Sequence, residues 1–332
     1  MPTVARYDFE EPVVWAGFVD DEPIFALADG AVVFPTGQVQ TFKAHDGLLA
    51  ATATQKGDGL ISGGEDGRIV VTNRTGVVER TVHPGKWIDA VAAGPGAAIG
   101  YAAARSAWIL TPSVAAPLEF AHERAVEGVC FAPKGLRIAC ARYNGVTLHW
   151  GIGTGKPVDL SWDGAHTGVT FSPDGSYVVT TMTENALHGW KLDRQNSGNS
   201  KHMRMSGYPT KPKCLSWSPR GRWLASSGAS SAVLWPFVGK DGPMGKTPKQ
   251  LANREGYLVT QVACHPVSDV VAVGYNDGLV GAANIHDDTD MVLRRPGEGL
   301  VPSAISSLSW DKNGNRLAFG TEEGEAGVIS VP

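Results

Sequence analysis

The feature that most constrains the fold of this 332-residue chain is a turn motif that recurs at nearly constant spacing. An aromatic residue, a proline two positions later and a glycine two further occur at 131–135, 171–175 and 217–221, and weaker copies occur at 264–266 and 310–314. The proline-equivalent positions are 40, 46, 47 and 46 residues apart. A regular period of about 40–50 residues indicates one supersecondary unit that is repeated, with the copies packed against one another.

Each copy of the motif is expected to form a turn between two antiparallel strands. Proline fixes φ at a turn position, and glycine accepts the positive φ that leads into the next strand. The 41 glycines and 21 prolines of the chain fit a fold with many turns and short strands. A more polar fourth strand should close each unit. Second strands are expected at 176–181, 222–228, 269–274 and 315–320, and third strands at 143–150, 184–190 and 231–235.

Composition excludes several classes of protein. Hydrophobic residues make up 42% of the chain, enough for a sizeable core. Charged residues make up only 19% and the net charge is −4, which argues against a protein that coats nucleic acid or an anionic membrane. No segment approaches the roughly 18 consecutive apolar residues that span a bilayer, and the first residues are too acidic for a secretion signal. We expect a cytoplasmic protein without a membrane partner, and favour a monomer while its oligomeric state stays open.

The four cysteines do not form a C-x-x-C pair, and each lies in an apolar, strand-like stretch. We therefore expect buried, reduced thiols rather than disulfides or metal ligands. They are Cys130, Cys140, Cys214 and Cys264.

Histidines and tryptophans recur with the same period as the turns. Loop histidines stand at positions 45, 83, 122 and 166, spaced by 38, 39 and 44 residues, and third strands end at tryptophans 150, 190 and 235. In this pattern the whole chain resembles the WD40 repeat family, although no unit has an intact Gly-His start and none of these three third-strand tryptophans is followed by Asp. The resemblance implies an all-β propeller.

The number of blades is predicted from the strand groups. Three-strand groups begin near residues 12, 48, 88, 126, 167, 212, 258 and 305. We therefore expect an eight-bladed β-propeller with four-stranded antiparallel blades, in a single domain over residues 1–332. The last unit ends after three strands, and the stretch 3–9 precedes the first group, so we expect this amino-terminal strand to join the last blade and close the ring.

The resemblance also implies a buried hydrogen-bonded tetrad in each unit, made of a loop His, a Ser or Thr, an acid and the Trp. This set is similar in composition to a Ser–His–Asp triad. A nucleophile, however, needs an oxyanion hole and usually a strained G-x-S-x-G turn, and neither accompanies these residues. We interpret them as structural rather than catalytic. The best copies are His166, Thr180, Glu184 and Trp190 in one unit, and His45, Ser62 and Asp66, without a Trp, in another.

Two surfaces are candidates for binding a partner. The first carries large aromatic residues and charges in loops and strand corners, the residue types that dominate interface energetics, although ordinary loop packing would also explain each of them. Its candidate residues are Trp87, Asp89, Arg105, Glu127, Tyr143, Tyr208, Lys213, Tyr257 and Tyr275.

The second surface is a basic sector in residues 191–254, which hold twelve Lys or Arg and two acidic residues. These could be solvated loops and outer strands, or a site for an acidic protein or a nucleic-acid backbone. Protein is favoured over nucleic acid because aromatic residues are not regularly interleaved with the basic ones. The candidate residues are Lys201, Arg204, Lys211, Arg220 and Arg222.

We expect no metal and no cofactor. Equivalent loop histidines of neighbouring blades should lie about 10 Å apart, whereas zinc needs its nitrogens within about 2 Å. The glycine-rich pieces 57–59 and 63–64 lack the Gly-Lys-Ser/Thr ending of a phosphate-binding loop.

The predicted function is a non-enzymatic scaffold that presents one propeller face to a protein or peptide partner. This prediction depends on analogy with the fold, because propellers also host enzymes. The alternatives are an enzyme or small-ligand binder that uses the central channel, and a binder of an acidic partner or nucleic acid through the basic sector. In the channel, only Asp89, Glu127 and Lys213 could do acid–base work, and they come from different units.

Overall fold

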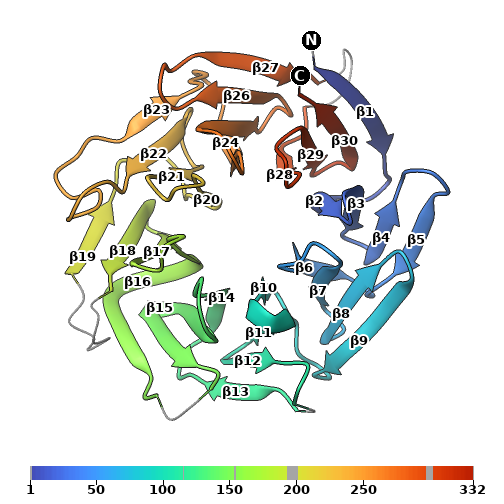
Figure 1. The fold of residues 1–332 in the computed structure, drawn as a ribbon, viewed down its shortest axis with the longest axis vertical. Coiled ribbons are helices and arrows are strands. Elements are labelled where there is room, and N and C mark those ends of the chain that lie inside the picture. Colours follow the sequence, from blue (N-terminus) through green and yellow to red (C-terminus); the bar gives the residue numbers. More distant parts are fainter. Residues whose placement is uncertain (1, 115, 153–154, 193–200, 297–301, 332) are drawn as a thin grey trace. The chain divides into compact units, whose positions relative to one another are not determined.

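The structure is a computed structural model that describes residues 2–114, 116–152, 155–192, 201–296 and 302–331. The described residues contain thirty β-strands and one three-residue 3-10 helix, η1 (Pro95–Ala97) (Figure 1). Within these ranges, no helix has the length and apolar character needed to cross a membrane. The chain divides into two compact units. The first unit comprises Met1–Ala28, Val32–Thr41 and Tyr208–Pro332, and the second comprises Asp29–Ala31 and Phe42–Gly207.

Four sheets lie wholly or mainly in the first unit, and each has four antiparallel strands. The strands of one sheet are β2 (Val13–Val19), β3 (Glu22–Leu27), β4 (Ala31–Phe34) and β5 (Gln40–Lys43). The second sheet contains β20 (Leu215–Trp217), β21 (Trp223–Ser226), β22 (Ala232–Pro236) and β23 (Lys249–Leu251). The third contains β24 (Val259–Cys264), β25 (Val270–Tyr275), β26 (Val280–Asn284) and β27 (Asp290–Arg294). The last contains β28 (Ile305–Trp310), β29 (Arg316–Thr321), β30 (Glu325–Ser330) and β1 (Thr3–Asp8).

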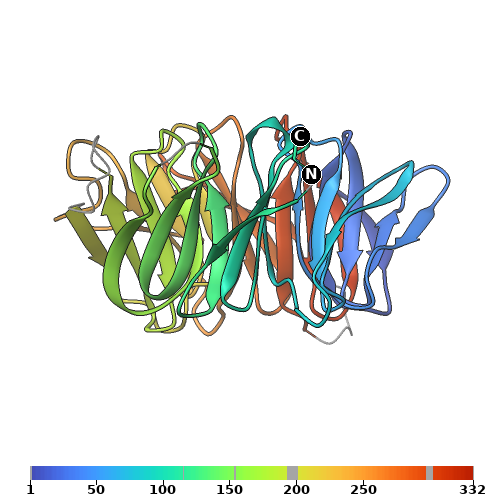
Figure 2. The same cartoon turned by 90° about the horizontal axis from the view of Figure 1, so that it is seen from below.

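Three sheets lie in the second unit. Two are four-stranded. One contains β6 (Leu48–Ala53), β7 (Leu60–Gly64), β8 (Arg68–Asn73) and β9 (Gly76–Val82). The other contains β10 (Ala90–Ala93), β11 (Ile99–Ala103), β12 (Ser106–Leu110) and β13 (Leu118–Ala121). The third is six-stranded, with β14 (Val126–Phe131), β15 (Arg137–Trp150), β16 (Val158–Phe171), β17 (Tyr177–Met182), β18 (Ala186–Lys191) and β19 (Lys201–Met205). Loops lie at the two ends of the strands in each sheet (Figure 2).

The prediction of eight blades is wrong. Counting each hydrogen-bonded sheet as one blade, the described residues form seven, six with four strands and one with six. The units predicted to begin near 126 and 167 are merged because β15 and β16 are long strands of 14 residues each. The first half of β15 pairs with β14 and its second half with β16, whose own second half pairs with β17. The all-β class and the antiparallel order of strands along the chain agree with the prediction.

The amino-terminal strand completes the last sheet, as expected from the sequence. β1 pairs antiparallel with β30, in a register that runs from Thr3 opposite Ser330 to Asp8 opposite Glu325. β1 thereby covers the backbone N–H and C=O groups of β30, which would otherwise form an open sheet edge.

Removal of residues 1–11 should therefore expose β30 as an edge strand and promote self-association. We expect the truncated protein to scatter light and elute as higher-order species at concentrations where the full chain does not. Size-exclusion chromatography with light scattering measures this. Unchanged elution and thermal melting would show that β1 contributes nothing to the last sheet.

Alternating strand residues supply the core of each unit. In the second unit, Trp190 and Val178 pack with Leu148 and Leu160, and all four are at most 2% exposed. In the first unit, Phe319 and Leu317 of β29 are fully buried with Ile329 of β30.

All four cysteines are free thiols. Cys140 is fully buried and the other three are partly exposed, so the expectation of buried thiols holds fully only for Cys140. Burial raises the pKa of Cys140 and of Cys264 to about 12, which keeps both thiols protonated at neutral pH.

Candidate functional site

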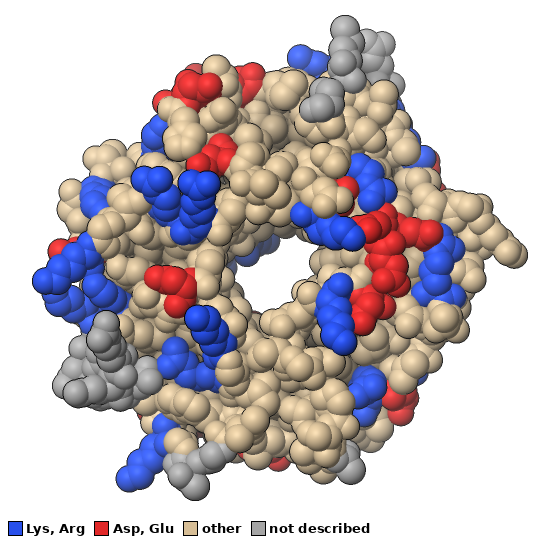
Figure 3. Space-filling model, in the orientation of Figure 1, with Lys and Arg blue, Asp and Glu red and all other residues tan. Residues whose placement is uncertain are grey.

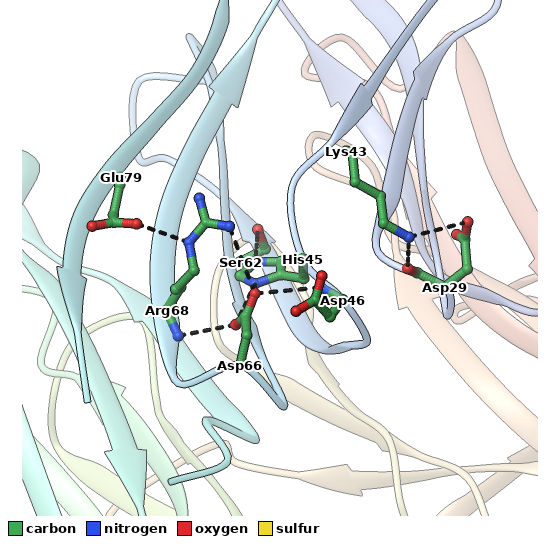
Figure 4. Close-up of polar contacts among 8 residues, drawn as sticks. All are labelled: Asp29, Lys43, His45, Asp46, Ser62, Asp66, Arg68 and Glu79. Atoms are coloured by element: carbon green, nitrogen blue, oxygen red, sulfur yellow. Dashed lines mark hydrogen bonds and ion pairs between the residues drawn. The ribbon is translucent and has the colours of Figure 1, made fainter. Parts of the chain in front are cut away.

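The structure brings His45, Ser62 and Asp66 together in one buried network of the second unit (Figure 4). Nδ1 of His45 donates to Oδ1 of Asp66 at 3.0 Å, and Nε2 accepts from the Ser62 hydroxyl at 2.9 Å. Asp66 also accepts from the backbone N–H of Arg68, whose guanidinium pairs with Glu79. Burial lowers the pKa of His45 despite the carboxylate partner, so the ring is neutral at neutral pH. The network therefore ties the loop that carries His45 to strand β7 and to the turn between β7 and β8.

The network around His166 differs from the predicted tetrad. Nε2 of His166 donates to the carbonyl of Trp162 at 3.0 Å, so Nδ1 accepts from the Thr180 hydroxyl at 2.7 Å. Glu184 accepts from the backbone N–H of Ala165 instead of the imidazole, and the Trp190 ring packs 5.4 Å from the His166 ring. His166 and Thr180 are both 0% exposed, which keeps a substrate away from the hydroxyl.

A third network escaped the sequence analysis because tyrosine takes the place of the loop histidine. Tyr208 is 7% exposed, and its hydroxyl accepts from the Trp235 indole N–H and donates to Ser226, both at 2.6 Å. Tyr208 was predicted to bind a partner, but its burial and its two hydrogen bonds place it in the first unit's interior. The sequence signal that could have found this network is a loop aromatic followed by Ser and Trp at the tetrad spacing.

Tyr275, another residue of the predicted binding surface, is buried in the structure. It is 1% exposed, its hydroxyl donates to the carbonyl of Ala252, and the Arg254 guanidinium lies 4.6 Å from its ring. Arg254 also lies 4.1 Å from the ring of Tyr257 and makes two hydrogen bonds to Asp277. Tyr257 remains 41% exposed, but part of its ring covers Arg254.

The substitution His45→Ala should cost stability. It leaves the buried Ser62 hydroxyl and the Asp66 carboxylate without their partner, and such losses cost about 1–3 kcal/mol. The free energy of unfolding from urea titration measures the loss. His286→Ala is the control, because His286 forms an exposed ion pair with Asp269, and such pairs contribute about 0–1 kcal/mol. Equal stability of the two variants would contradict a structural role for His45.

A groove lies beside the His166 network, within the second unit. Its volume is about 620 Å³, and it is lined by residues of the β14 entry, the centre of β15, the centre of β16 and the β17–β18 turn. The lining includes Glu127 and Tyr143 of the predicted binding surface, together with Arg124 and Thr167. Sequence analysis missed Arg124, which stands only three positions before Glu127.

The position of Tyr143 in the groove is set by backbone conformation. It precedes Asn144 and Gly145, which have φ of 64° and 133°, and it pairs with Ala165 of β16. Arg142 donates to the Tyr143 carbonyl at 3.1 Å. The ring is nevertheless 50% exposed, so a fixed backbone presents a large aromatic surface to solvent.

The other residues of the predicted binding surface are not gathered in this groove. Trp87, 62% exposed, lies in the loop between β9 and β10, together with exposed Asp89, and Arg105 is exposed between β11 and β12. Lys213 lines a different groove of about 410 Å³ in the first unit, with Lys211 and Glu322. There the hydroxyls of Thr260 and Ser306 donate to backbone carbonyls, which gives them structural partners.

The residues of the predicted basic sector are all exposed, but they are divided between the two units. Lys201 and Arg204 lie on β19 of the second unit, whereas Lys211, Arg220 and Arg222 lie in the first. On the face drawn in Figure 3, blue and red side chains both occur among a largely tan surface. This distribution resembles a mixed surface rather than a uniformly basic one.

Among the described residues, one group has donor atoms close enough to share a metal ion. It consists of His122, Cys140 and His149, in the second unit. This group was not predicted from the sequence, because the expectation of no metal depended on the spacing of equivalent loop histidines, whereas Cys140 and His149 lie on a strand.

The antiparallel blades and the loop-to-strand networks define a β-propeller. Two of its segments, residues 36–73 and 200–235, match the family model for the WD domain, G-beta repeat. These two segments contain the His45 and Tyr208 networks, and they identify no subfamily.

Comparison with solved structures supports the fold. The crystal structure of the computationally designed Ika8 protein is similar, with a TM-score of 0.78, 19% sequence identity and 98% of each chain covered. At that identity the likeness concerns the fold alone. No curated protein matches the chain.

Proposed function

We propose that this protein is a non-enzymatic interaction module that binds a segment of a partner protein in the groove around Tyr143. The observation that carries the proposal is the half-exposed ring of Tyr143 in a groove of about 620 Å³. WD40 propellers commonly mediate protein interactions, and two segments of this chain match that repeat.

The groove has the chemistry of a polypeptide site. A tyrosine supplies a large contact area at low entropic cost, because its ring has few rotatable bonds and here a fixed backbone holds it. Arg124 and Glu127 add opposite charges on the same groove and can fix the direction of a bound segment through complementary charges. The partner best suited to this groove is an extended segment with one apolar side chain and charges of both signs.

Catalysis is disfavoured by the burial of the groups that resemble a triad. Ser62 and Thr180 are each 0% exposed, and each is hydrogen-bonded to a buried imidazole. A nucleophile must reach its substrate, which these hydroxyls do not.

Selection from a displayed peptide library tests the proposal. The wild-type protein should enrich a consensus sequence, and Tyr143→Ala should abolish that enrichment. Leu118→Ala is the matched control, because Leu118 is 44% exposed in the same unit but lies on β13, outside the groove. Equal enrichment by Tyr143→Ala and wild type, or no consensus with the wild type, would contradict the proposal.

A further inference from the structure

The second unit holds a cluster of soft donor atoms that the interaction function does not use. His122 lies in the loop after β13, and Cys140 and His149 lie in the two halves of β15. One Nε2 or Nδ1 atom of each histidine and the Cys140 Sγ all lie within 4.8 Å of one another. Cys140 is 0% and His149 7% exposed, whereas His122 is partly exposed and leaves a route from solvent.

The separation of the two imidazoles is that of ligands on one ion. Nε2 of His122 and Nε2 of His149 are 3.3 Å apart, and their rings are nearly perpendicular, at 81°. Two nitrogens bound to one zinc ion at about 2.0–2.1 Å in tetrahedral geometry lie about 3.3–3.4 Å apart. The geometry points to a Zn²⁺ site formed by Nε2 of His122, Nε2 of His149 and Sγ of Cys140, with a fourth position for water.

Comparison with the other networks of the chain explains why this cluster needs an ion. In them a hydroxyl of the second strand is hydrogen-bonded to the loop residue: Ser62 donates to His45, Thr180 donates to His166, and Ser226 accepts from Tyr208. In this sheet a thiol, which is a weak hydrogen-bond donor, takes the place of the hydroxyl. A second imidazole, that of His149, lies with its Nε2 3.3 Å from Nε2 of the loop histidine, whereas the ring of His188 in the His166 network lies 6.2 Å from the loop histidine, centroid to centroid. Thiolate and imidazole are the donor types that select zinc.

The surroundings hold the donors in place. The His149 ring stacks on Phe120 with centroids 4.4 Å apart. Between Cys140 and His149 in β15, Arg142 Nε donates to the Thr147 hydroxyl at 2.8 Å, and both side chains bond to Asp159 at 2.7 Å. These contacts fix the two halves of β15, which carry Cys140 and His149, relative to each other.

Proton balance gives the site a measurable signature. Imidazole binds a metal ion through a neutral nitrogen, whereas a thiol must lose its proton to bind as the thiolate. Each Zn²⁺ that binds should displace the Cys140 proton into the buffer.

Cobalt titration of the chelator-treated full chain tests the site directly. Co²⁺ should bind at one ion per chain, with a thiolate-to-metal charge-transfer band and the strong visible bands of tetrahedral cobalt, and Zn²⁺ should displace it. Calorimetry of Zn²⁺ binding in two buffers should show release of one proton per ion. A wild-type spectrum without the thiolate band overturns the site whatever the variants do, and indicates that His122 and His149 share only an N–H···N hydrogen bond.

Variants then identify the ligands. Cys140→Ser introduces the hydroxyl that the other networks use, so the variant should fold. It should lose the thiolate-to-metal band, and its zinc affinity should fall by more than about 100-fold. The loss of a residue that only supports a metal ligand costs about 10–100-fold in affinity, so the loss of a ligand should cost more. His122→Ala, in the partly exposed loop, should lose affinity similarly. Cys130→Ser, a thiol on β14 of the same sheet, is the control and should bind like wild type. Wild-type affinity in both Cys140→Ser and His122→Ala would overturn the assignment.

Discussion

Acidification should destabilise the protein steeply, because the His188 ring is buried. The residue is 0% exposed, neither ring nitrogen has a hydrogen-bond partner among the residues that the structure describes, and the ring stacks on Trp162 with centroids 4.2 Å apart. Burial is the main reason that its pKa falls to about 3, and the charges of nearby His166, His202 and Arg204 lower it further. In the unfolded chain the pKa is 6.5.

Between these two pKa values the unfolded chain binds a proton that the folded protein does not, so unfolding becomes easier as the pH falls. The stability contribution of the neutral ring is complete above pH 6.5 and is lost progressively below it. Each pH unit in this window costs about 1.4 kcal/mol, so His188 alone should remove about 3 kcal/mol between pH 6.5 and pH 4. Urea titrations across this range measure the loss.

The variant His188→Phe keeps an aromatic ring against Trp162 but cannot bind a proton. As the pH falls, the free energy of unfolding of this variant should therefore decrease less steeply than that of the wild type. The two slopes should differ by about 1 kcal/mol or more per pH unit. If His188→Phe and wild type lose stability in parallel, His188 is not the acid-sensitive group.

Loss of the Glu325 carboxylate should destabilise the first unit strongly. Glu325, at the start of β30, forms an ion pair with Arg294, at the end of β27, whose side chain is only 1% exposed. The guanidinium also donates to the carbonyl of Gly278 and lies 4.9 Å from the Phe319 ring. Glu325→Ala leaves a buried positive charge without its partner, which costs about 3–5 kcal/mol. Urea or thermal unfolding measures the loss.

The double variant Arg294→Met, Glu325→Leu provides the matched control. Replacing both charges by apolar groups of similar size is often neutral, so this variant should be more stable than Glu325→Ala alone. A cost below about 1 kcal/mol for Glu325→Ala would mean that the pair behaves like an exposed one.

The repeat predicted the fold class because turn chemistry and strand alternation are local properties of the chain. The turn at 171–175 indeed joins β16 and β17, and β1 pairs with β30. Blade number was not predictable in this way, because it depends on whether strands continue across a boundary. The unit expected to begin near residue 167 starts inside β16, which runs without a break from Val158 to Phe171.

Side-chain burial limited the prediction of the site. Tyr143 and Tyr275 each follow a second strand in the sequence, but the first is 50% and the second 1% exposed. The difference arises because Arg254 and the carbonyl of Ala252 bind Tyr275, both from a loop distant in sequence. The His122, Cys140 and His149 cluster was missed for the same reason, since its donors meet only when β13 and β15 fold together.

The central claim, that the groove around Tyr143 binds a partner segment, is tested most directly by the dissociation constant of a peptide that the library selects. Tyr143→Ala should weaken binding by about 2 kcal/mol or more, roughly 30-fold, because a desolvated aromatic anchor is lost. The wild-type affinity should change little from 0.1 M to 1 M salt, over which the Debye length falls from about 10 Å to about 3 Å. Normal binding by Tyr143→Ala, together with loss of binding when Lys201 and Arg204 are reversed to Glu, would contradict the account and assign the partner to the basic residues instead.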